Sequence, residues 1–276
     1  MTARRRTPGR VAVHLLLWGY GVVALLPLVV MVLNSLRPTS EIFTTPLGLP
    51  ASPTLNSYAR VWTEASFSSY LTNSLVVTCG AVLLGTAVSA LAAYPLARYD
   101  FAGSRVLGAY FLAGLMLPIR LGLVPIFYLM DSMGLIDSLL GLTLLYAASG
   151  VPFCVFVLSA FYRSLPGELD EAARIDGAGE FRIFGQIMLP LVRPALASVM
   201  LFQFVPLWHE FLYPLVLLRS DEKFTIPRGL SQFFGEYTTD WSALFAGLVL
   251  ATAPLFVLFV LATRQIIAGL TAGMSK

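Results

Sequence analysis

Residues 165–190, LPGELDEAARIDGAGEFRIFGQIMLP, form a polar stretch within a very apolar chain. The stretch holds five of the fifteen acidic residues of the sequence. Pro166 suits the first turn of a helix, where its missing N–H costs nothing, and Gly177-Ala178-Gly179 can end that helix with a left-handed cap. A second periodic run predicts another short helix, stopped by Pro190, with one face made by Phe181, Phe184 and Ile187. The stretch therefore predicts a helix–turn–helix.

The first of these helices carries small side chains beside carboxylates. At i, i+3, i+4 and i+7 spacing, one face is predicted to hold Leu169, Ala172, Ala173 and Asp176. Alanine leaves room for another backbone to come close. The helix is therefore a candidate docking surface for a partner.

The composition predicts an integral membrane protein. The chain is 57% hydrophobic and 12% charged, whereas soluble domains carry about 25% charged residues. The apolar run that follows Arg4-Arg5-Arg6 exceeds the roughly 7–15 residues of a signal-peptide core, so it is read as a retained first span. We expect one transmembrane domain, with a core at 71–265 and a loop at 163–194. Its six spans are predicted near 11–34, 71–97, 106–129, 141–162, 195–218 and 242–263.

The distribution of basic residues predicts the orientation of these spans. With the N-terminus inside, twelve of the eighteen Lys and Arg residues fall in inner segments. An excess of Lys and Arg marks the cytoplasmic side. Both termini and the 163–194 loop are therefore expected in the cytoplasm.

The sequence shows no motif for catalysis in this chain. It has no GxxxxGK[ST] loop, and its only lysines, Lys223 and Lys276, do not follow such glycines. HExxH and GxSxG are also absent, and His14 and His209 lie in different predicted spans. No enzyme activity, metal site, cofactor or nucleic-acid partner is expected. The N-terminal arginines are read as topology signals.

One polar group interrupts the predicted fifth span, at Trp208-His209-Glu210. Ionisable residues at membrane depth usually face a cavity or a partner helix. The group therefore either lines a translocation path or fixes the bundle through an interhelical hydrogen bond. For Arg120, a side chain that reaches the membrane interface is favoured over one that lines a path. The two cysteines, Cys79 and Cys154, are predicted to be buried free thiols.

The central stretch resembles a known family motif. Its fixed spacing is similar to the EAA loop of ABC-importer membrane subunits at Glu171-Ala172-Ala173, Gly177, Ile187 and Leu189-Pro190. Other segments look like the MalG-type carbohydrate permeases: Asn73-Ser74-Leu75, Ala92-Ala93-Tyr94, Met133-Gly134-Leu135, Pro214-Leu215 and Gly269 to Gly273. Such permeases tend to show Trp-Asn-Glu where this chain has Trp208-His209-Glu210.

The resemblance implies an all-α, six-span, type I importer permease in a bacterial cell membrane. Its implied partners are membrane lipid, a second six-span permease, ATPase subunits that bind the ATP, and an external solute-binding protein. The aromatic outer loop at 219–241, with Phe224, Phe233, Phe234, Tyr237 and Trp241, either contacts that external protein or forms an interfacial belt.

The resemblance also implies roles for the residues of the central stretch. Glu171 would offer a carboxylate to a basic residue of the ATPase, Ala172 and Ala173 would permit close packing, and Gly177 would allow the turn. The coupling set is completed by Asp176, Ile187, Leu189 and Pro190. The expected solute is a sugar or oligosaccharide. Alternatives are an ABC permease for an amino acid, polyamine or glycerol phosphate, an ion-coupled secondary transporter, and a membrane enzyme.

Overall fold

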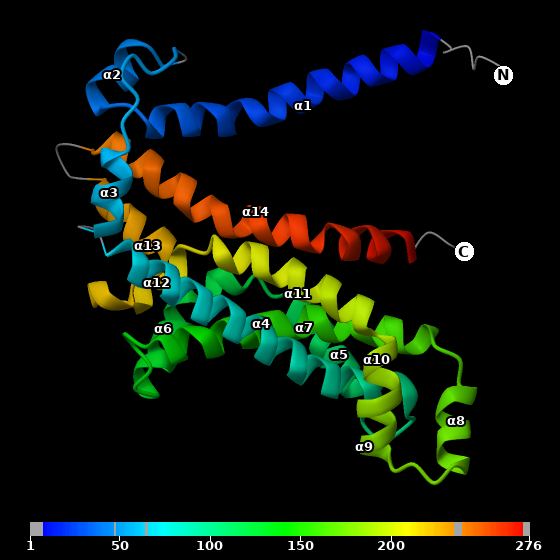
Figure 1. The fold of residues 1–276 in the computed structure, drawn as a ribbon. Helices are drawn as coiled ribbons and strands as arrows, with labels where there is room; N and C mark the ends of the chain where they lie inside the picture. Colours follow the sequence, from blue (N-terminus) through cyan, green and yellow to red (C-terminus); the bar gives the residue numbers. More distant parts are fainter. Residues whose placement is uncertain (1–7, 47, 64–65, 235–238, 273–276) are drawn as a thin grey trace. The chain divides into compact units, whose positions relative to one another are not determined.

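The computed structural model describes residues 8–46, 48–63, 66–234 and 239–272 (Figure 1). Over these residues the chain is helical, and its only extended pairing is an isolated bridge between Phe234 and Thr239. The predicted all-α class is confirmed. The residues group into two compact units, one with Met1–Phe67 and Leu230–Pro254 and one with Ser68–Gly229 and Leu255–Lys276.

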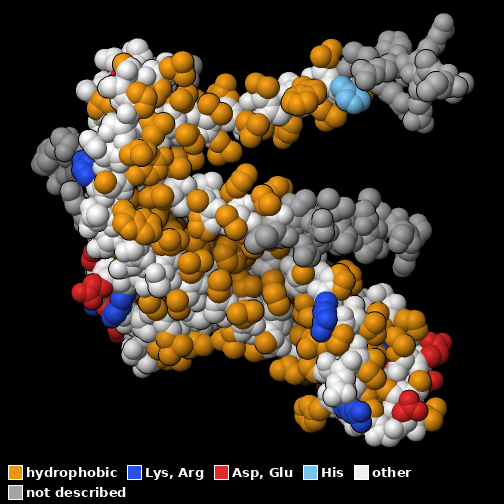
Figure 2. Space-filling model, in the orientation of Figure 1, with side chains coloured by type: hydrophobic (Ala, Val, Ile, Leu, Met, Phe, Trp, Pro, Cys, Tyr) orange, Lys and Arg blue, Asp and Glu red, His pale blue; other side chains and the backbone are white. Residues whose placement is uncertain are grey.

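The first unit contains one long helix and several short segments. Its elements are α1 (Pro8–Ser35), α2 (Thr39–Thr44), α3 (Asn56–Thr63), a 3₁₀ turn (Ser231–Phe233) and the first part of α14 (Trp241–Ala272). Apolar side chains extend along the surface of α1 (Figure 2). Figure 2 therefore agrees with a membrane environment for this helix, as its composition predicts.

The second unit is a bundle that ends in a hairpin (Figure 1). Its long elements are α4 (Phe67–Arg98), α5 (Ser104–Met116), α6 (Leu123–Ser132), α7 (Leu139–Ser164) and α11 (Arg193–Trp208). The hairpin consists of α8 (Glu168–Ile175), α9 (Glu180–Arg182), a π-helical turn (Ile183–Met188) and α10 (Leu189–Leu191). The remaining elements are the 3₁₀ turns Ile119–Gly122 and Asp221–Lys223, α12 (Leu212–Leu217) and α13 (Ile226–Leu230).

Four helices of the described chain are long and apolar enough to cross a membrane: Ala12–Ser35, Phe67–Arg98, Leu139–Ser164 and Trp241–Val260. Two bent pairs raise the number of candidate spans to as many as six. One pair joins Ser104–Met116 to Ile119–Ser132 at 85°, and the other joins Glu180–Leu191 to Arg193–Trp208 at 72°.

The third and fifth predicted spans are broken rather than continuous. Leu117 adopts an extended conformation (ψ 121°), as a residue before proline tends to do, and α5 ends just before it. Pro214 cannot donate to the carbonyl of Glu210, which weakens a helix in this region. Accordingly, α11 ends at Trp208 and α12 starts at Leu212. Each of the predicted spans 106–129 and 195–218 is therefore divided between two helices.

Small residues allow α4 and α7 to pack closely. A Cβ on Gly85 would lie 3.0 Å from the carbonyl oxygen of Ala147. The core formed here continues into the hairpin, because the same buried cluster contains Ala93, Leu158 and Ile183. Cys154 is a buried free thiol, whereas Cys79 is free but exposed, so its predicted burial is wrong.

The other end of the second unit is held by one carboxylate. Asp137, between α6 and α7, accepts hydrogen bonds from the backbone N–H groups of Arg219 (2.9 Å) and Ser220 (3.0 Å). Lys223 adds an ion pair at 2.9 Å. Burial alone would raise the pKa of Asp137, but these hydrogen bonds outweigh it and hold the pKa well below its usual range. This carboxylate therefore fixes the segment after α12 against the start of α7.

Candidate functional site

The turn of the hairpin is a Schellman motif. Gly177 has φ +78°, a left-handed conformation that costs glycine little. Its N–H donates to Arg174 O at 3.0 Å, and the N–H of Ala178 donates to Ala173 O at 2.9 Å. The predicted left-handed cap is therefore present at Gly177, and it ends α8 at a defined residue.

The buried face of α8 differs from the predicted one. Asp170 and Ala173 are 5% and 6% exposed, whereas Ala172 and Asp176 are exposed. Of the predicted face, Ala173 and part of Leu169 pack inward, whereas Ala172 and Asp176 remain on the outer side. The reason is that Asp170 has a buried partner, which turns its side of the helix inward.

The second half of the hairpin also differs. Ile183 and Met188 are fully buried, whereas Phe181 is 90% exposed. The wider π-helical turn from Ile183 to Met188 changes the angular spacing of the side chains. Phe184 and Ile187 of the predicted face are half-buried against the core, whereas Phe181 does not belong to it. Pro190 does not stop this segment, because α10 continues to Leu191 before the chain bends.

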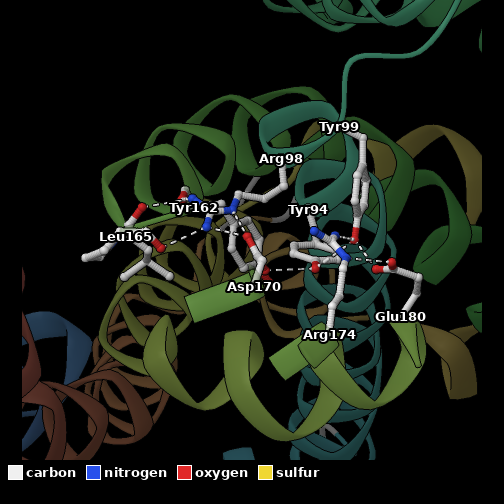
Figure 3. Close-up of polar contacts among 9 residues, drawn as sticks. Tyr94, Arg98, Tyr99, Tyr162, Leu165, Asp170, Arg174 and Glu180 are labelled. Carbon is white, nitrogen blue, oxygen red and sulfur yellow. Dashed lines mark hydrogen bonds and ion pairs between the residues drawn. The ribbon is translucent and has the colours of Figure 1, made fainter. Parts of the chain in front are cut away.

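Arg98, at the end of α4, anchors the hairpin to the bundle (Figure 3). Its guanidinium forms an ion pair with Asp170, with Nε 2.5 Å from Oδ2, and both side chains are 8% exposed. The same group donates to carbonyl oxygens at the end of α7 and just beyond it: Tyr162 (3.3 Å), Leu165 (2.8 Å) and Pro166 (3.0 Å). One side chain thus ties α4 and α7 to α8.

A second polar cluster fixes the start of α9 (Figure 3). The Tyr99 hydroxyl donates to Glu180 and lies 2.9 Å from the hydroxyl of Tyr94. Arg174 donates to Glu180 at 3.1 Å and to the Tyr99 hydroxyl at 3.2 Å. The hydrogen bonds from Arg174 and Tyr99 lower the pKa of Glu180. Burial, then the bond to Glu180, raises the pKa of Tyr99.

These contacts leave one side of α8 free. Glu171 and Ala172 are exposed, as is Ile175 at 86%. Figure 2 shows acidic and basic side chains gathered over the hairpin. Of the other coupling residues, Ile187, Leu189 and Pro190 are half-buried beneath this surface. The hairpin is therefore held rigidly against the bundle and presents a small, partly acidic outer face.

The three residues of the predicted polar group have different environments. Trp208 is 3% exposed and stacks on Phe204, with ring centroids 5.6 Å apart. His209 is exposed, and its Nδ1 lies 3.0 Å from Val205 O. Glu210 forms an ion pair with Arg120 at 3.1 Å. The Arg120 side chain thus pairs with a neighbouring segment and is otherwise 71% exposed, and its predicted reach to the membrane interface stays a prediction.

The aromatic residues of the predicted outer loop are only partly exposed. Phe224 is 3% exposed, with the Arg228 guanidinium 4.3 Å from its ring centroid, so this side chain is buried rather than presented to the external protein or to an interfacial belt. Phe234 is 57% exposed and contacts Trp241 edge-on at 6.2 Å. Tyr237 lies outside the described residues. Across the described ranges, no group of three or more His, Cys, Asp or Glu residues is placed to hold a metal ion.

Comparisons with known proteins agree over nearly the whole chain. The binding-protein-dependent transport system inner membrane component family matches residues 81–272. The diacetylchitobiose uptake system permease protein NgcG of Streptomyces coelicolor is 37% identical over 262 residues, covering 94% of this chain and 87% of that protein. The maltodextrin transport system permease protein MdxG of Bacillus subtilis is 34% identical over 273 residues, covering 98% of both.

A solved structure has the same fold. A chain of a bacterial ABC transporter involved in the import of the acidic polysaccharide alginate superposes with a TM-score of 0.83. The comparison covers 96% of this chain and 98% of that one, at 22% sequence identity. The family match and the similarity to two permeases of comparable length point to the same family, and the shared fold is consistent with it. The chain belongs to the binding-protein-dependent transport system inner membrane components.

Proposed function

We propose that this chain is the membrane-spanning permease subunit of an ATP-driven importer for an oligosaccharide. The observation that carries the proposal is its similarity to NgcG and MdxG, which covers 94% and 98% of the chain. Both relatives are named as permeases for carbohydrates, and so is the arabinooligosaccharide permease AraQ of Bacillus subtilis, which is 34% identical over 271 residues. The proposed solute is therefore a neutral oligosaccharide.

The proposed partners follow from the family. A separate ATPase binds the ATP, an external solute-binding protein delivers the sugar, and a second permease completes the path. This chain itself carries no cofactor and performs no catalysis. We place it in a bacterial cell membrane with both termini in the cytoplasm. The distribution of Lys and Arg supports that orientation, which puts the hairpin on the side of the ATPase.

The exposed side of α8 is the proposed contact with the ATPase. Glu171 is placed to offer a carboxylate, and Ala172 leaves space for a neighbouring backbone. Ala173 instead packs inward, so its role is to hold α8 against the bundle. The rigid connection through Arg98 supports a mechanism in which motion of the ATPase turns α4 and α7 together with α8.

Reconstitution of the complex tests this function. We expect the chain, purified in mild detergent, to bring with it a Walker-A ATPase and a second permease. In proteoliposomes, uptake of a labelled sugar should require ATP and the binding protein. The panel should contain diacetylchitobiose, maltodextrin and arabinooligosaccharides, with an amino acid, a polyamine and glycerol phosphate as competing candidates.

Two variants separate docking from folding. Ala172→Trp should prevent ATPase binding while the permease keeps its thermal stability, whereas Ala173→Trp should destabilise the permease itself because its site is filled. Uptake that continues without the ATPase and stops with an ionophore would establish a secondary transporter instead. Uptake of only a non-sugar candidate would keep the importer and reject the oligosaccharide.

A further inference from the structure

The two broken helices of the second unit meet at their breaks. Arg120 lies in the 3₁₀ turn between α5 and α6, and Glu210 lies between α11 and α12. Their side chains form an ion pair at 3.1 Å. The hydroxyl of Tyr213 also donates to the carbonyl oxygen of Ile119 at 3.1 Å. The two breaks are therefore joined to each other.

This ion pair lies at membrane depth. The 16 residues of α11 precede it, which is about 24 Å of helix at 1.5 Å per residue. The hydrocarbon core of a bilayer is about 30 Å thick. With α11 starting at the inner edge, Glu210 lies inside the core and in its outer third. The 13 residues of α5 and the turn after it bring Arg120 to a similar depth by a separate route.

A charged group at this depth is costly when it faces lipid. The Arg120 side chain is 71% exposed, whereas that of Glu210 is 11% exposed. The Glu210 carboxylate already accepts from Arg120 and from the N–H of Leu212 at 2.9 Å. Within the described chain the other N–H groups of Arg120 have no acceptor. Charged residues in spans usually face a cavity or polar partner, so the exposed side of Arg120 indicates a polar surface.

An apolar groove begins beside Arg120. It has a volume of about 730 Å³, and both neighbours of Arg120, Ile119 and Leu121, contribute to its lining. Its other walls come from α5, α6 and α7, at Gly114, Ile126, Leu145 and Pro152. Ligand pockets commonly have volumes of about 300–1,000 Å³ and combine an apolar lining with a few polar groups. Arg120 does not itself line the groove, but it is next in sequence to two residues that do, so the ion pair would supply polar groups beside an apolar lining.

We propose that Arg120 and Glu210 form a sugar subsite on the translocation path, at the rim of this groove. The proposal rests on the function proposed above. Arg120 donates hydrogen bonds to sugar hydroxyl groups, and the C–H faces of the sugar ring contact the groove. His209, exposed on the adjacent turn, contributes a further polar atom. Trp208 is excluded from this subsite because its ring is buried against Phe204.

The charge balance of the pair selects the class of solute. A lone arginine at membrane depth would attract an anionic sugar. Glu210 neutralises Arg120 and so removes that attraction. The subsite therefore fits a neutral, hydroxyl-rich oligosaccharide.

The test uses the whole complex in proteoliposomes, with the purified binding protein at saturation. The probe is whichever labelled sugar that protein binds among diacetylchitobiose, maltodextrin and an arabinooligosaccharide. The variants are Arg120→Gln, Glu210→Gln and the exchanged pair Arg120→Glu with Glu210→Arg. Arg105→Gln, which removes an exposed arginine outside the groove, is the matched control.

We expect each single variant and the exchanged pair to reduce uptake at least tenfold. ATPase stimulation by the loaded binding protein should stay within about twofold of the wild type. The exchanged pair should also recover the thermal midpoint that the single variants lose, because the ion pair is restored. Arg105→Gln should transport normally.

Three results would overturn the subsite. Unchanged uptake in the single variants would show that the sugar does not depend on the ion pair. Recovery of uptake together with the thermal midpoint in the exchanged pair would show that the ion pair only holds the two breaks together. A wild-type complex that imports none of the three sugars would overturn the proposed function, and with it the subsite for sugar.

Discussion

The side-chain oxygen of Gln203 occupies the space that a Cβ on Gly150 would need, since the two would lie 1.8 Å apart. Gly150 is in α7 and Gln203 is in α11, where its side chain is buried. Its Nε2 lies 2.6 Å from the sulfur of Cys154. The close approach of these two helices therefore depends on the missing side chain at position 150.

Gly150→Ala should destabilise the chain by about 1–3 kcal/mol, because the added methyl group displaces a buried amide. Adding Gln203→Ala to the same chain should restore most of the loss. Thermal unfolding in detergent measures both effects. Gly108→Ala on α5 is the control, since nothing lies within 4 Å of its Cβ position. Equal stability of Gly150→Ala and wild type would contradict the packing described here.

Asp170→Ala should release the hairpin from the bundle. It leaves the Arg98 guanidinium buried without its carboxylate, which costs about 3–5 kcal/mol. Hydrogen exchange across α8 should become faster, and uptake should be lost while the spans stay inserted. Glu168→Ala, an exposed carboxylate on the same helix, should leave the exchange rate unchanged. Equal protection of α8 in the two variants would show that the ion pair does not hold the hairpin.

Gly177→Ala should weaken the turn by about 1–2 kcal/mol, because an L-residue is strained at φ +78°. Gly177→Asn should cost less, since asparagine tolerates this conformation, and Gly177→Pro should abolish uptake. Gly179→Ala is the matched control, because Gly179 has φ −72° and open space at its Cβ position. Limited proteolysis of the hairpin and uptake both report the effect. A Gly179→Ala variant as impaired as Gly177→Ala would refute the conformational explanation.

Asp137 should protect the backbone amides of Arg219 and Ser220 well into the acid range. A carboxyl group whose pKa is lowered by folding contributes stability above its unfolded pKa of about 3.9. That contribution is lost only as the pH falls through the lower folded pKa. Asp137→Ala should speed exchange of both amides about tenfold at neutral pH. Asp131→Ala, which removes an exposed acid nearby, should not change the exchange rate of either amide. Loss of protection near pH 4 in the wild type would contradict the lowered pKa of Asp137.

The elements of the chain were predictable where local chemistry decides them. Gly177 was recognisable as a cap because three small residues followed an amphipathic run, and the cap is present. The prolines at 118 and 214 are visible in the sequence. Whether such a proline kinks the helix or breaks it depends on the tertiary packing of the residues that follow it, which local sequence does not determine.

The contacts of the hairpin were not predictable in the same way. Arg98 and Asp170 are 72 residues apart, and no local spacing connects them. In the sequence, Asp170 is one of five acidic residues in the stretch, and nothing distinguishes it as the buried partner of Arg98. The π-helical turn at Ile183–Met188 has no signal of its own in a 3.6-residue pattern, so the buried side of that segment was misassigned.

The way in which Arg98 holds α7 sets which positions are able to vary among relatives. Three of its contacts are to the main-chain oxygens of Tyr162, Leu165 and Pro166. Every amino acid supplies that oxygen, so substitution at these three positions leaves the contacts in place. Only position 170 contributes a side chain that arginine requires. Across related sequences, residues 98 and 170 should therefore change together, while the residue types between α7 and α8 vary independently of them.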